Sequence, residues 1–237
     1  MPQFILMTMS YIVSLILTFA SFFMHINGQS SLEIANRFSV IFAPMNISYV
    51  IWIVIYLFLG YWLAMNMKKT SMKQTALFSC INILQALTVY VWHHELFIVS
   101  LGITLLLVLY VFMLYSSYPL NDQSMSGRLP FAIYFAWATF TCITNTSFTL
   151  TAYGWNGFGL SAPLWAVILL TLGGAIALHI RFHHFDRIYP SVFIWAYIGI
   201  ALHNGFDELL VTTASLFLCG ALFVGILFMK KNPAYQK

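Results

Sequence analysis

The chain has 237 residues, of which 61% are hydrophobic and only 7% are charged. Soluble globular proteins carry about 25% charged residues, so this composition excludes a water-facing surface over most of the molecule. The net charge of +4 does not indicate a nucleic-acid partner, because the basic residues stand in short connections beside apolar runs, as topology signals do.

Apolar runs long enough to cross a hydrocarbon core about 30 Å thick recur along the whole chain. Because lipid offers the backbone no hydrogen-bond partner, we expect each run to be a helix. The runs are continuous and do not alternate, which disfavours a transmembrane β-barrel. The predicted fold class is therefore an all-α integral membrane protein with eight transmembrane helices. The predicted spans are 4–25, 46–66, 74–93, 96–115, 129–151, 161–181, 190–205 and 208–229.

The distribution of Lys and Arg predicts the orientation of these spans. Arg37 alone falls in one set of connections, and the other nine basic residues fall in the opposite set. Since cytoplasmic loops carry an excess of Lys and Arg, we expect both termini to lie in the cytoplasm. The nine residues are Lys68, Lys69, Lys73, Arg128, Arg181, Arg187, Lys230, Lys231 and Lys237.

The connection 27–44, after the first span, is long enough to fold over the outer mouth of the bundle as a lid. Its middle is amphipathic, which suits a segment lying along the membrane interface. A plain loop anchored by a few aromatic residues is the alternative. The apolar residues of this middle part are Leu32, Ile34, Ala35, Phe38, Ile41 and Phe42.

Aromatic and amide side chains mark the second and third spans. Trp52 and Tyr56 stand one turn apart and share a helix face. In the third span Asn82 and Gln85 are i, i+3 neighbours, and Trp92 stands at the outer end. Ligand binding is one reading of these residues. Helix packing and, for Trp92, the interfacial aromatic belt are the alternatives.

The third span ends in His93, His94 and Glu95. Imidazole and carboxylate groups are zinc ligands, so these three residues are kept as metal candidates beside the alternative of plain interfacial polarity. His179 and His183 also have a chelating spacing, but the arginines beside them disfavour a cation and favour anionic lipid headgroups.

The fifth span is the most informative. Pro130, Tyr134, Trp137, Thr141 and Asn145 follow one another at spacings of 4, 3, 4 and 4, which places them on one helix face. Indole, phenol and amide groups together suit a planar ligand with polar edges. A seam between two helices is the alternative. No Asp, Glu, Lys or Arg stands in the middle of any span, which disfavours an ion-driven pump.

Two motifs resemble one family. The stretch 44–62, with Trp52, Tyr56 and Gly60, resembles the P-x-x-x-F-x-x-V-W-x-x-L-Y-x-x-M-G pattern of the TspO/MBR family. These are the tryptophan-rich sensory proteins related to the translocator protein, or peripheral benzodiazepine receptor. The run from Pro130 to Asn145 looks like that family's Pro, Tyr, Trp and Asn signature helix. The stretches 92–95, 164–167 and 193–197 look like a longer bacterial branch with further C-terminal helices.

The resemblance implies a five-helix core whose pocket is closed by the loop after the first helix. It implies binding of porphyrins, haem-type tetrapyrroles or sterol-like lipids there, with Trp52, Trp137 and Asn145 as the matched lining positions. The third span departs from the family pattern, because Gln85 and Thr88 stand where an Asn and a Trp are expected. We therefore divide the chain into a TspO-like core, 1–151, and three appended helices, 152–237.

The predicted function is a TspO-like receptor or sensor that binds a planar hydrophobic ligand between the second, third and fifth spans. A small-molecule or lipid transporter, and an intramembrane enzyme acting on lipid or tetrapyrrole, stay open as alternatives. No catalytic residue is predicted, and porphyrin or haem enters only as a ligand. The predicted ligand-binding residues are Trp52, Tyr56, Asn82, Gln85, Trp92, Tyr134, Trp137, Thr141 and Asn145.

Membrane lipids and a small hydrophobic ligand are the expected partners, a homodimer is left open, and nucleic acid is excluded. The expected location is a multi-pass position in a bacterial plasma membrane.

Overall fold

A computed structural model describes residues 2–38, 40–67 and 70–230 of the chain. Within these ranges the protein is built from helices and their connections, as the apolar runs predict. The elements are α1 (Pro2–Phe23), α2 (Ser31–Arg37), the 3₁₀ segment η1 (Asn46–Val50), α3 (Ile51–Asn66), α4 (Met72–His93), α5 (Phe97–Tyr115), α6 (Leu129–Ala152), the 3₁₀ segment η2 (Gly157–Gly159), α7 (Ala162–His184), α8 (Ile188–Asn204) and α9 (Leu209–Phe228).

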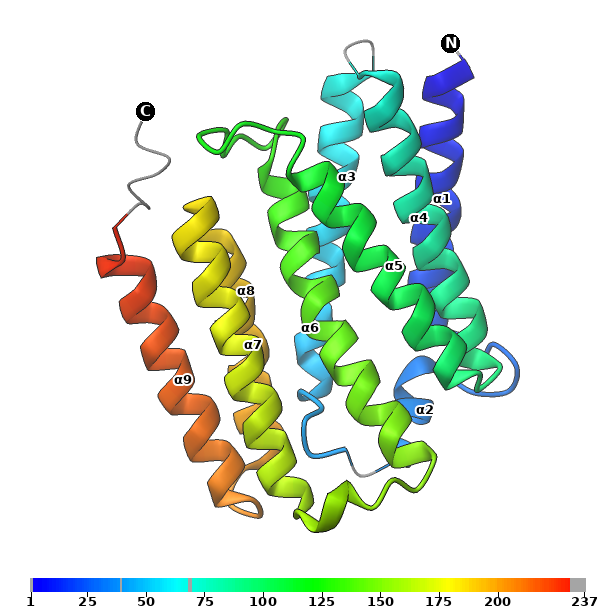
Figure 1. The fold of residues 1–237 in the computed structure, drawn as a ribbon. Coiled ribbons are helices and arrows are strands. Elements are labelled where there is room, and N and C mark those ends of the chain that lie inside the picture. Colours follow the sequence, from blue (N-terminus) through cyan, green and yellow to red (C-terminus); the bar gives the residue numbers. More distant parts are fainter. Residues whose placement is uncertain (1, 39, 68–69, 231–237) are drawn as a thin grey trace.

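The long helices of the described residues form an up-and-down bundle. Each predicted span coincides with one long helix to within a few residues. Figure 1 shows consecutive long helices running in opposite directions, so α1 begins and α9 ends at the same end of the bundle. We call this the basic end and the opposite end, which carries α2, the lid end. Four of the basic residues used to predict the orientation, Lys68, Lys69, Lys231 and Lys237, lie outside the described residues.

Apolar side chains also cover the outside of the bundle. Leu57 is 66% exposed, Leu202 is 60% exposed and Phe217 is 74% exposed. So much apolar surface is incompatible with water but matches lipid. Among the described residues, six helical stretches are long and apolar enough to cross a membrane, namely α1, η1 with α3, α4, α5, α7 and α9. The chain is therefore a multi-pass helical membrane protein.

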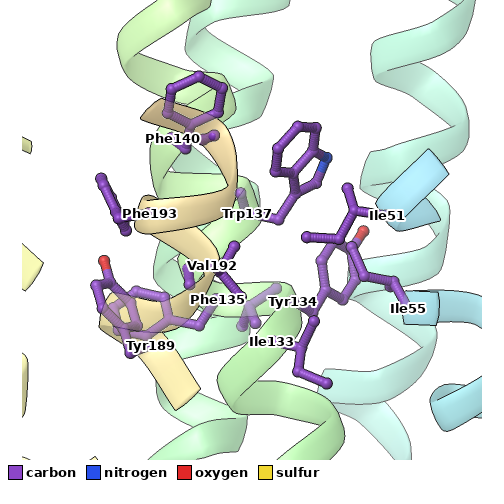
Figure 2. Close-up of a cluster of buried hydrophobic side chains, with 14 of the residues drawn as sticks. Ile51, Ile55, Ile133, Tyr134, Phe135, Trp137, Phe140, Tyr189, Val192 and Phe193 are labelled. Carbon is purple, nitrogen blue, oxygen red and sulfur yellow. The ribbon is translucent and has the colours of Figure 1, made fainter. Parts of the chain in front are cut away.

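Helix α6 is the centre of the bundle. It packs against α3, α5 and α8, while α4 joins α1 to α5, and α7 and α9 pack around α8. Residues 130–140 of α6 are buried on every side, and Thr139 is the polar residue among them apart from the tyrosine and tryptophan. Figure 2 shows Tyr134 and Trp137 of α6 on the side of α3, with Tyr189 and Phe193 of α8 on the other side. The helix thus joins the two halves of the molecule.

A buried charge cluster ties α8 to the basic end of the bundle. Asp186 is 4% exposed and Arg128 is 2% exposed. The Asp186 carboxylate accepts hydrogen bonds from the Tyr115 hydroxyl at 2.8 Å and from the Ile188 and Tyr189 backbone N–H groups at 2.8 and 3.1 Å. Arg128 lies 4.0 Å from the same carboxylate and over the Tyr115 ring. The carboxylate therefore caps α8 and also neutralises a buried guanidinium.

Arg181 caps the C-terminal end of the neighbouring helix α9. It is 1% exposed, and its Nη2 donates to the backbone oxygens of Ile226 and Met229 at 3.2 and 2.8 Å. These carbonyls belong to the end of α9, where a helix has no partners of its own. Arg128 was predicted as a topology signal, and Arg181 as a topology signal that also favours anionic headgroups. The structure adds a packing role to each, and Arg181 is too buried to meet a headgroup.

Candidate functional site

A largely apolar cavity lies at the lid end between α1, α2, α3, α4, α5 and α6. Its empty volume is about 790 Å³, including the part that opens to the surroundings. Five of the nine predicted ligand-binding residues contribute to its wall, from three different helices. These five residues are Trp52, Gln85, Trp92, Thr141 and Asn145.

Asn145, in the wall of this cavity, has one buried polar atom without a hydrogen-bond partner among the described residues. Its Nδ2 donates to the Ser100 hydroxyl at 3.1 Å and to the Thr104 hydroxyl at 3.2 Å, which fixes the amide against α5. Its Oδ1 is buried and has no hydrogen-bond partner among the described residues, and the residue is 5% exposed. A buried acceptor without a partner is costly, so this oxygen is suited to accept a hydrogen bond from a bound molecule.

Tyr56 and Tyr134 lie behind the cavity wall and hold one part of it. The Tyr56 hydroxyl bonds Ser14 at 2.7 Å and Thr18 at 2.8 Å. The Gln85 amide donates to Thr18 at 3.4 Å and accepts from the Tyr134 hydroxyl at 3.4 Å. Thr18 and Gln85 both line the cavity. The two tyrosines therefore position lining residues without lining the cavity themselves.

Trp137 lies behind the wall as well. It is fully buried, and its ring meets that of Tyr49 edge-on at 6.0 Å between centroids. Tyr49 lines the cavity, so Trp137 supports it from behind.

Asn82 lies outside this cavity. Its Nδ2 donates to the Phe78 backbone oxygen at 2.8 Å, and it lines a groove between α1 and α4.

Aromatic rings close the cavity toward the lid end. The Trp92 and Phe148 ring centroids are 4.6 Å apart, and both residues line the cavity. Phe38, just after α2, meets Phe148 edge-on at 4.9 Å. The tilted and edge-on geometry is the one that aromatic pairs prefer. Trp92, which also suited an interfacial belt, therefore belongs to the wall of the cavity.

The predicted lid contains a real helix, α2, and three of its residues, Ser31, Leu32 and Ala35, lie in the cavity wall. A capping box starts it: the Glu33 N–H donates to the Ser30 hydroxyl at 3.3 Å, and the Ser30 N–H donates to the Glu33 carboxylate at 2.6 Å. The hydrogen bond from the Ser30 backbone lowers the pKa of the Glu33 carboxyl. The start of the lid therefore folds on local signals alone.

An ion pair and α8 hold the rest of the lid. Arg37 bonds the Glu95 carboxylate at 2.9 Å and also donates to Gln29, which ties α2 to the turn after α4. The segment after residue 39 is bonded to α8 by three contacts between distant parts of the chain. Met45 N donates to Gly199 O at 2.9 Å, Trp195 Nε1 to Ser48 O at 3.0 Å, and Asn204 Nδ2 to Ile41 O at 2.9 Å.

The three metal candidates have separate environments. The His93 Nδ1 lies 2.9 Å from the Val89 backbone oxygen, the His94 ring packs on Tyr90 at 4.4 Å, and Glu95 pairs with Arg37. In the part of the chain that the structure describes, no group of three or more His, Cys, Asp or Glu residues could hold a metal ion.

The contribution of α1 to the cavity was not predicted from the sequence. Thr18, Ser21 and Phe22 line it, opposite Thr144 and Phe148 of α6. A signal was present, because Ser14, Thr18 and Ser21 stand at spacings of 4 and 3 in an otherwise apolar span. Such a stripe places hydroxyl groups on one helix face. The remaining lining residues that were not predicted are Ser31, Ala43, Tyr49, Thr88, Val89 and Ser100.

Comparison with known proteins gives one match. The model of the family described as TSPO-like protein matches residues 4–228, which includes every long helix of the bundle. No curated protein matches the chain. No solved structure matches it.

Proposed function

The chain belongs to the TSPO-like protein family, and from that premise we propose that it is a membrane receptor or sensor for a planar hydrophobic ligand. The ligand binds in the cavity beneath α2 and is a porphyrin or haem-type tetrapyrrole, or a sterol-like lipid. The cavity wall is largely apolar and partly aromatic, as the walls of sites for small hydrophobic molecules are.

The partnerless Asn145 Oδ1 is the observation that supports this proposal most directly. It is a buried acceptor at the edge of a largely apolar cavity. Ligand sites of this kind combine apolar and aromatic walls with a few placed polar groups that set the ligand's orientation. Trp52 and Trp92 supply aromatic walls, and the Asn145 side-chain oxygen supplies the hydrogen-bond acceptor.

The packing of the basic end disfavours a continuous open passage through the bundle in this conformation. Trp62 stacks on Phe78 at 4.9 Å and meets Phe131 edge-on at 5.0 Å. Its Nε1 donates to the Tyr118 hydroxyl at 2.9 Å. This layer fills the space between α3, α4 and α6 on the basic side of the cavity, so the cavity opens toward one side only.

We further propose that all eight long helices cross a bacterial plasma membrane, with both termini and the basic end in the cytoplasm. In this arrangement α1 to α6 bind the ligand, and α7 to α9 hold the lid through α8. The bonds from α8 to Ile41, Met45 and Ser48 support that division of roles. A homodimer stays a prediction.

Titration of the purified protein in lipid nanodiscs with protoporphyrin IX and with haemin tests the proposed function. Tryptophan fluorescence and the Soret band should both report saturable binding. Trp52→Phe should weaken the affinity about two- to tenfold, because a smaller ring loses part of the aromatic contact. Trp62→Phe, at the packed basic end, should leave the affinity unchanged. The absence of saturable binding by either tetrapyrrole, and by a sterol, would overturn the proposal.

A further inference from the structure

A second cavity lies on the other side of the lid segment, between the lid ends of α6 and α7. Its empty volume is about 1150 Å³, including the part that opens to the surroundings. Val40, Ile41 and Phe42 form one wall, whereas Ala43 faces the first cavity. No predicted ligand-binding residue lines it. The chain 40–43 therefore separates two cavities that share no lining residue.

Two indole rings form the aromatic side of this second cavity. The ring centroids of Trp155 and Trp165 are 4.8 Å apart, and the Trp165 Nε1 donates to the Gly157 backbone oxygen at 2.8 Å. Gly157 has φ +65°, and a Cβ atom there would lie 3.2 Å from Trp165 Nε1. Glycine is favoured at this position both by its backbone conformation and by the indole beside it. The turn η2 thus fixes Trp165 against the cavity.

Hydroxyl groups of α6 form the polar side. Thr146, Ser147 and Thr151 line the cavity. The Thr146 hydroxyl donates to the Cys142 backbone oxygen and the Thr151 hydroxyl to the Ser147 backbone oxygen, each at 2.9 Å. Their protons are therefore engaged, while their oxygen lone pairs can still accept a hydrogen bond. This side of the cavity suits a group that donates hydrogen bonds and carries no negative charge.

The connection between α6 and α7, which contributes Trp155 to this cavity, also exposes aromatic side chains. Tyr153 is 61% exposed and Phe158 is 81% exposed. Tyr and Trp gather at the level of the lipid headgroups, where one end of the ring is apolar and the other is wet. Leu150, Ala166 and Leu169 add apolar groups to the cavity wall.

We propose that this cavity is a second binding site, for a neutral membrane amphiphile that carries a hydroxyl group. Its apolar body packs against the two indoles and the leucines, and its hydroxyl donates to the row of oxygens on α6. The site is separate from the one assigned to the planar ligand, so either can exist without the other.

A photoreactive octanol that carries a diazirine tests this site in the full chain in nanodiscs, with adducts mapped by mass spectrometry. Labelling of residues 146–169 should saturate with concentration. Excess unlabelled octanol should abolish it, and excess octane should not. This competition needs no substitution, so it does not depend on the folding of a variant. Labelling that does not saturate, or that octane displaces equally well, would overturn the proposal.

Two variants separate this site from the first cavity. Ser147→Phe fills the second cavity and should abolish the saturable labelling, while protoporphyrin IX binds as before. Thr171→Phe is the matched control, because Thr171 is exposed on α7 and lines neither cavity. The Thr171→Phe protein should be labelled to the same extent as the unchanged protein. Equal labelling of the Ser147→Phe protein would place the alcohol elsewhere and contradict the assignment.

Discussion

Asn145 stands at the point where α5, α6 and the first cavity meet, and its two amide atoms have different roles. The nitrogen is engaged by Ser100 and Thr104, and the oxygen has no partner within the described part of the chain. Asn145→Ala should therefore remove an acceptor from the ligand while the aromatic walls stay in place. We expect the loss of about 1–2 kcal/mol of binding free energy, or about five- to thirtyfold in Kd for protoporphyrin IX.

Asn82 is the matched control, because it is the other asparagine among the predicted ligand-binding residues. Its amide bonds Phe78 within its own helix, and it lies outside the first cavity. Asn82→Ala should leave the Kd unchanged. If both variants bind the ligand as the unchanged protein does, hydrogen bonding by Asn145 does not contribute to recognition.

The negative charge of Asp186 is expected to stabilise the folded basic end. Its carboxylate is the acidic group beside the buried Arg128, and it also caps α8. Asp186→Asn keeps a side-chain oxygen for the cap but leaves the guanidinium without its counter-charge. Breaking such a buried pair costs about 3–5 kcal/mol, so the free energy of unfolding should fall by that order.

Thermal unfolding in detergent micelles measures this effect. Asp122→Asn is the control, because among the described residues its carboxylate bonds the nearby Ser124 in an exposed turn. An exposed substitution of this kind is expected to change stability by no more than about 0.5 kcal/mol. An equal effect of the two variants would show that the buried pair does not stabilise the fold.

At the scale of elements, α8 holds the lid, and Gly199 lies directly against it. A Cβ atom at Gly199 would lie 2.0 Å from Ser48 Oγ and 3.1 Å from Pro44 Cβ. Gly199→Ala should therefore push the segment 44–48 away from α8. We expect a loss of about 1–3 kcal/mol in the free energy of unfolding, as for other overpacked sites, and faster dissociation of the ligand.

Stopped-flow dissociation and thermal unfolding check the Gly199 prediction together. Gly220→Ala on α9 is the control, since nothing lies within 4 Å of the added Cβ atom. Ala is the better helix former by about 1 kcal/mol, so this variant should be as stable as the unchanged chain or more so. Adding Ser48→Ala to Gly199→Ala should restore part of the loss, and no restoration would argue against the contact.

The elements of the bundle could be predicted because each has a local signal. Apolar run length located every long helix, and the capping pair Ser30 and Glu33 marks the start of α2 in the sequence. The site could be predicted only in part. Spacing shows that Tyr134, Trp137, Thr141 and Asn145 share a broad helix face, but it does not show which neighbour each one meets.

The contacts of the lid are the clearest example of structure that could not be predicted from the sequence. Ser48 and Trp195 are 147 residues apart, and their bond depends on how the last three helices pack. No local pattern specifies that packing. The three last helices were predicted as an appended layer without a stated purpose, and the bonds from α8 to the lid support the role that we propose for them.

At the scale of the whole molecule, the two cavities, the lid and α8 form one assembly at the lid end. The basic end contains the packed Trp62 layer and the buried Arg128 and Asp186 cluster. The ligand recognition that we propose therefore belongs to one end of the bundle, and the tightly packed layer belongs to the other. This difference between the two ends matters for function only if the bundle crosses a membrane, so that the two ends face different compartments.

The orientation and the number of crossings can be tested together, and α8 is the critical helix. Its 17 residues rise about 26 Å, a few ångströms less than the hydrocarbon core. A shortfall of this size is met by local thinning of the bilayer at modest cost, so we expect α8 to cross. Single cysteines at Ser124, Asn156, Arg187 and Phe206 sample four successive connections in a chain whose native cysteines are replaced.

An impermeant maleimide applied to intact cells should label the cysteines at positions 156 and 206 only. Those at 124 and 187 should react after permeabilisation. The pair 187 and 206 brackets α8, so labelling of both from the same side would mean that α8 does not cross. Positions 124 and 156 bracket α6 and test it in the same way. This test is useful because α6 was predicted as a span although it carries a row of hydroxyl groups. If positions 124 and 187 alone react in intact cells, the orientation is reversed, and the lid and both cavities face the cytoplasm.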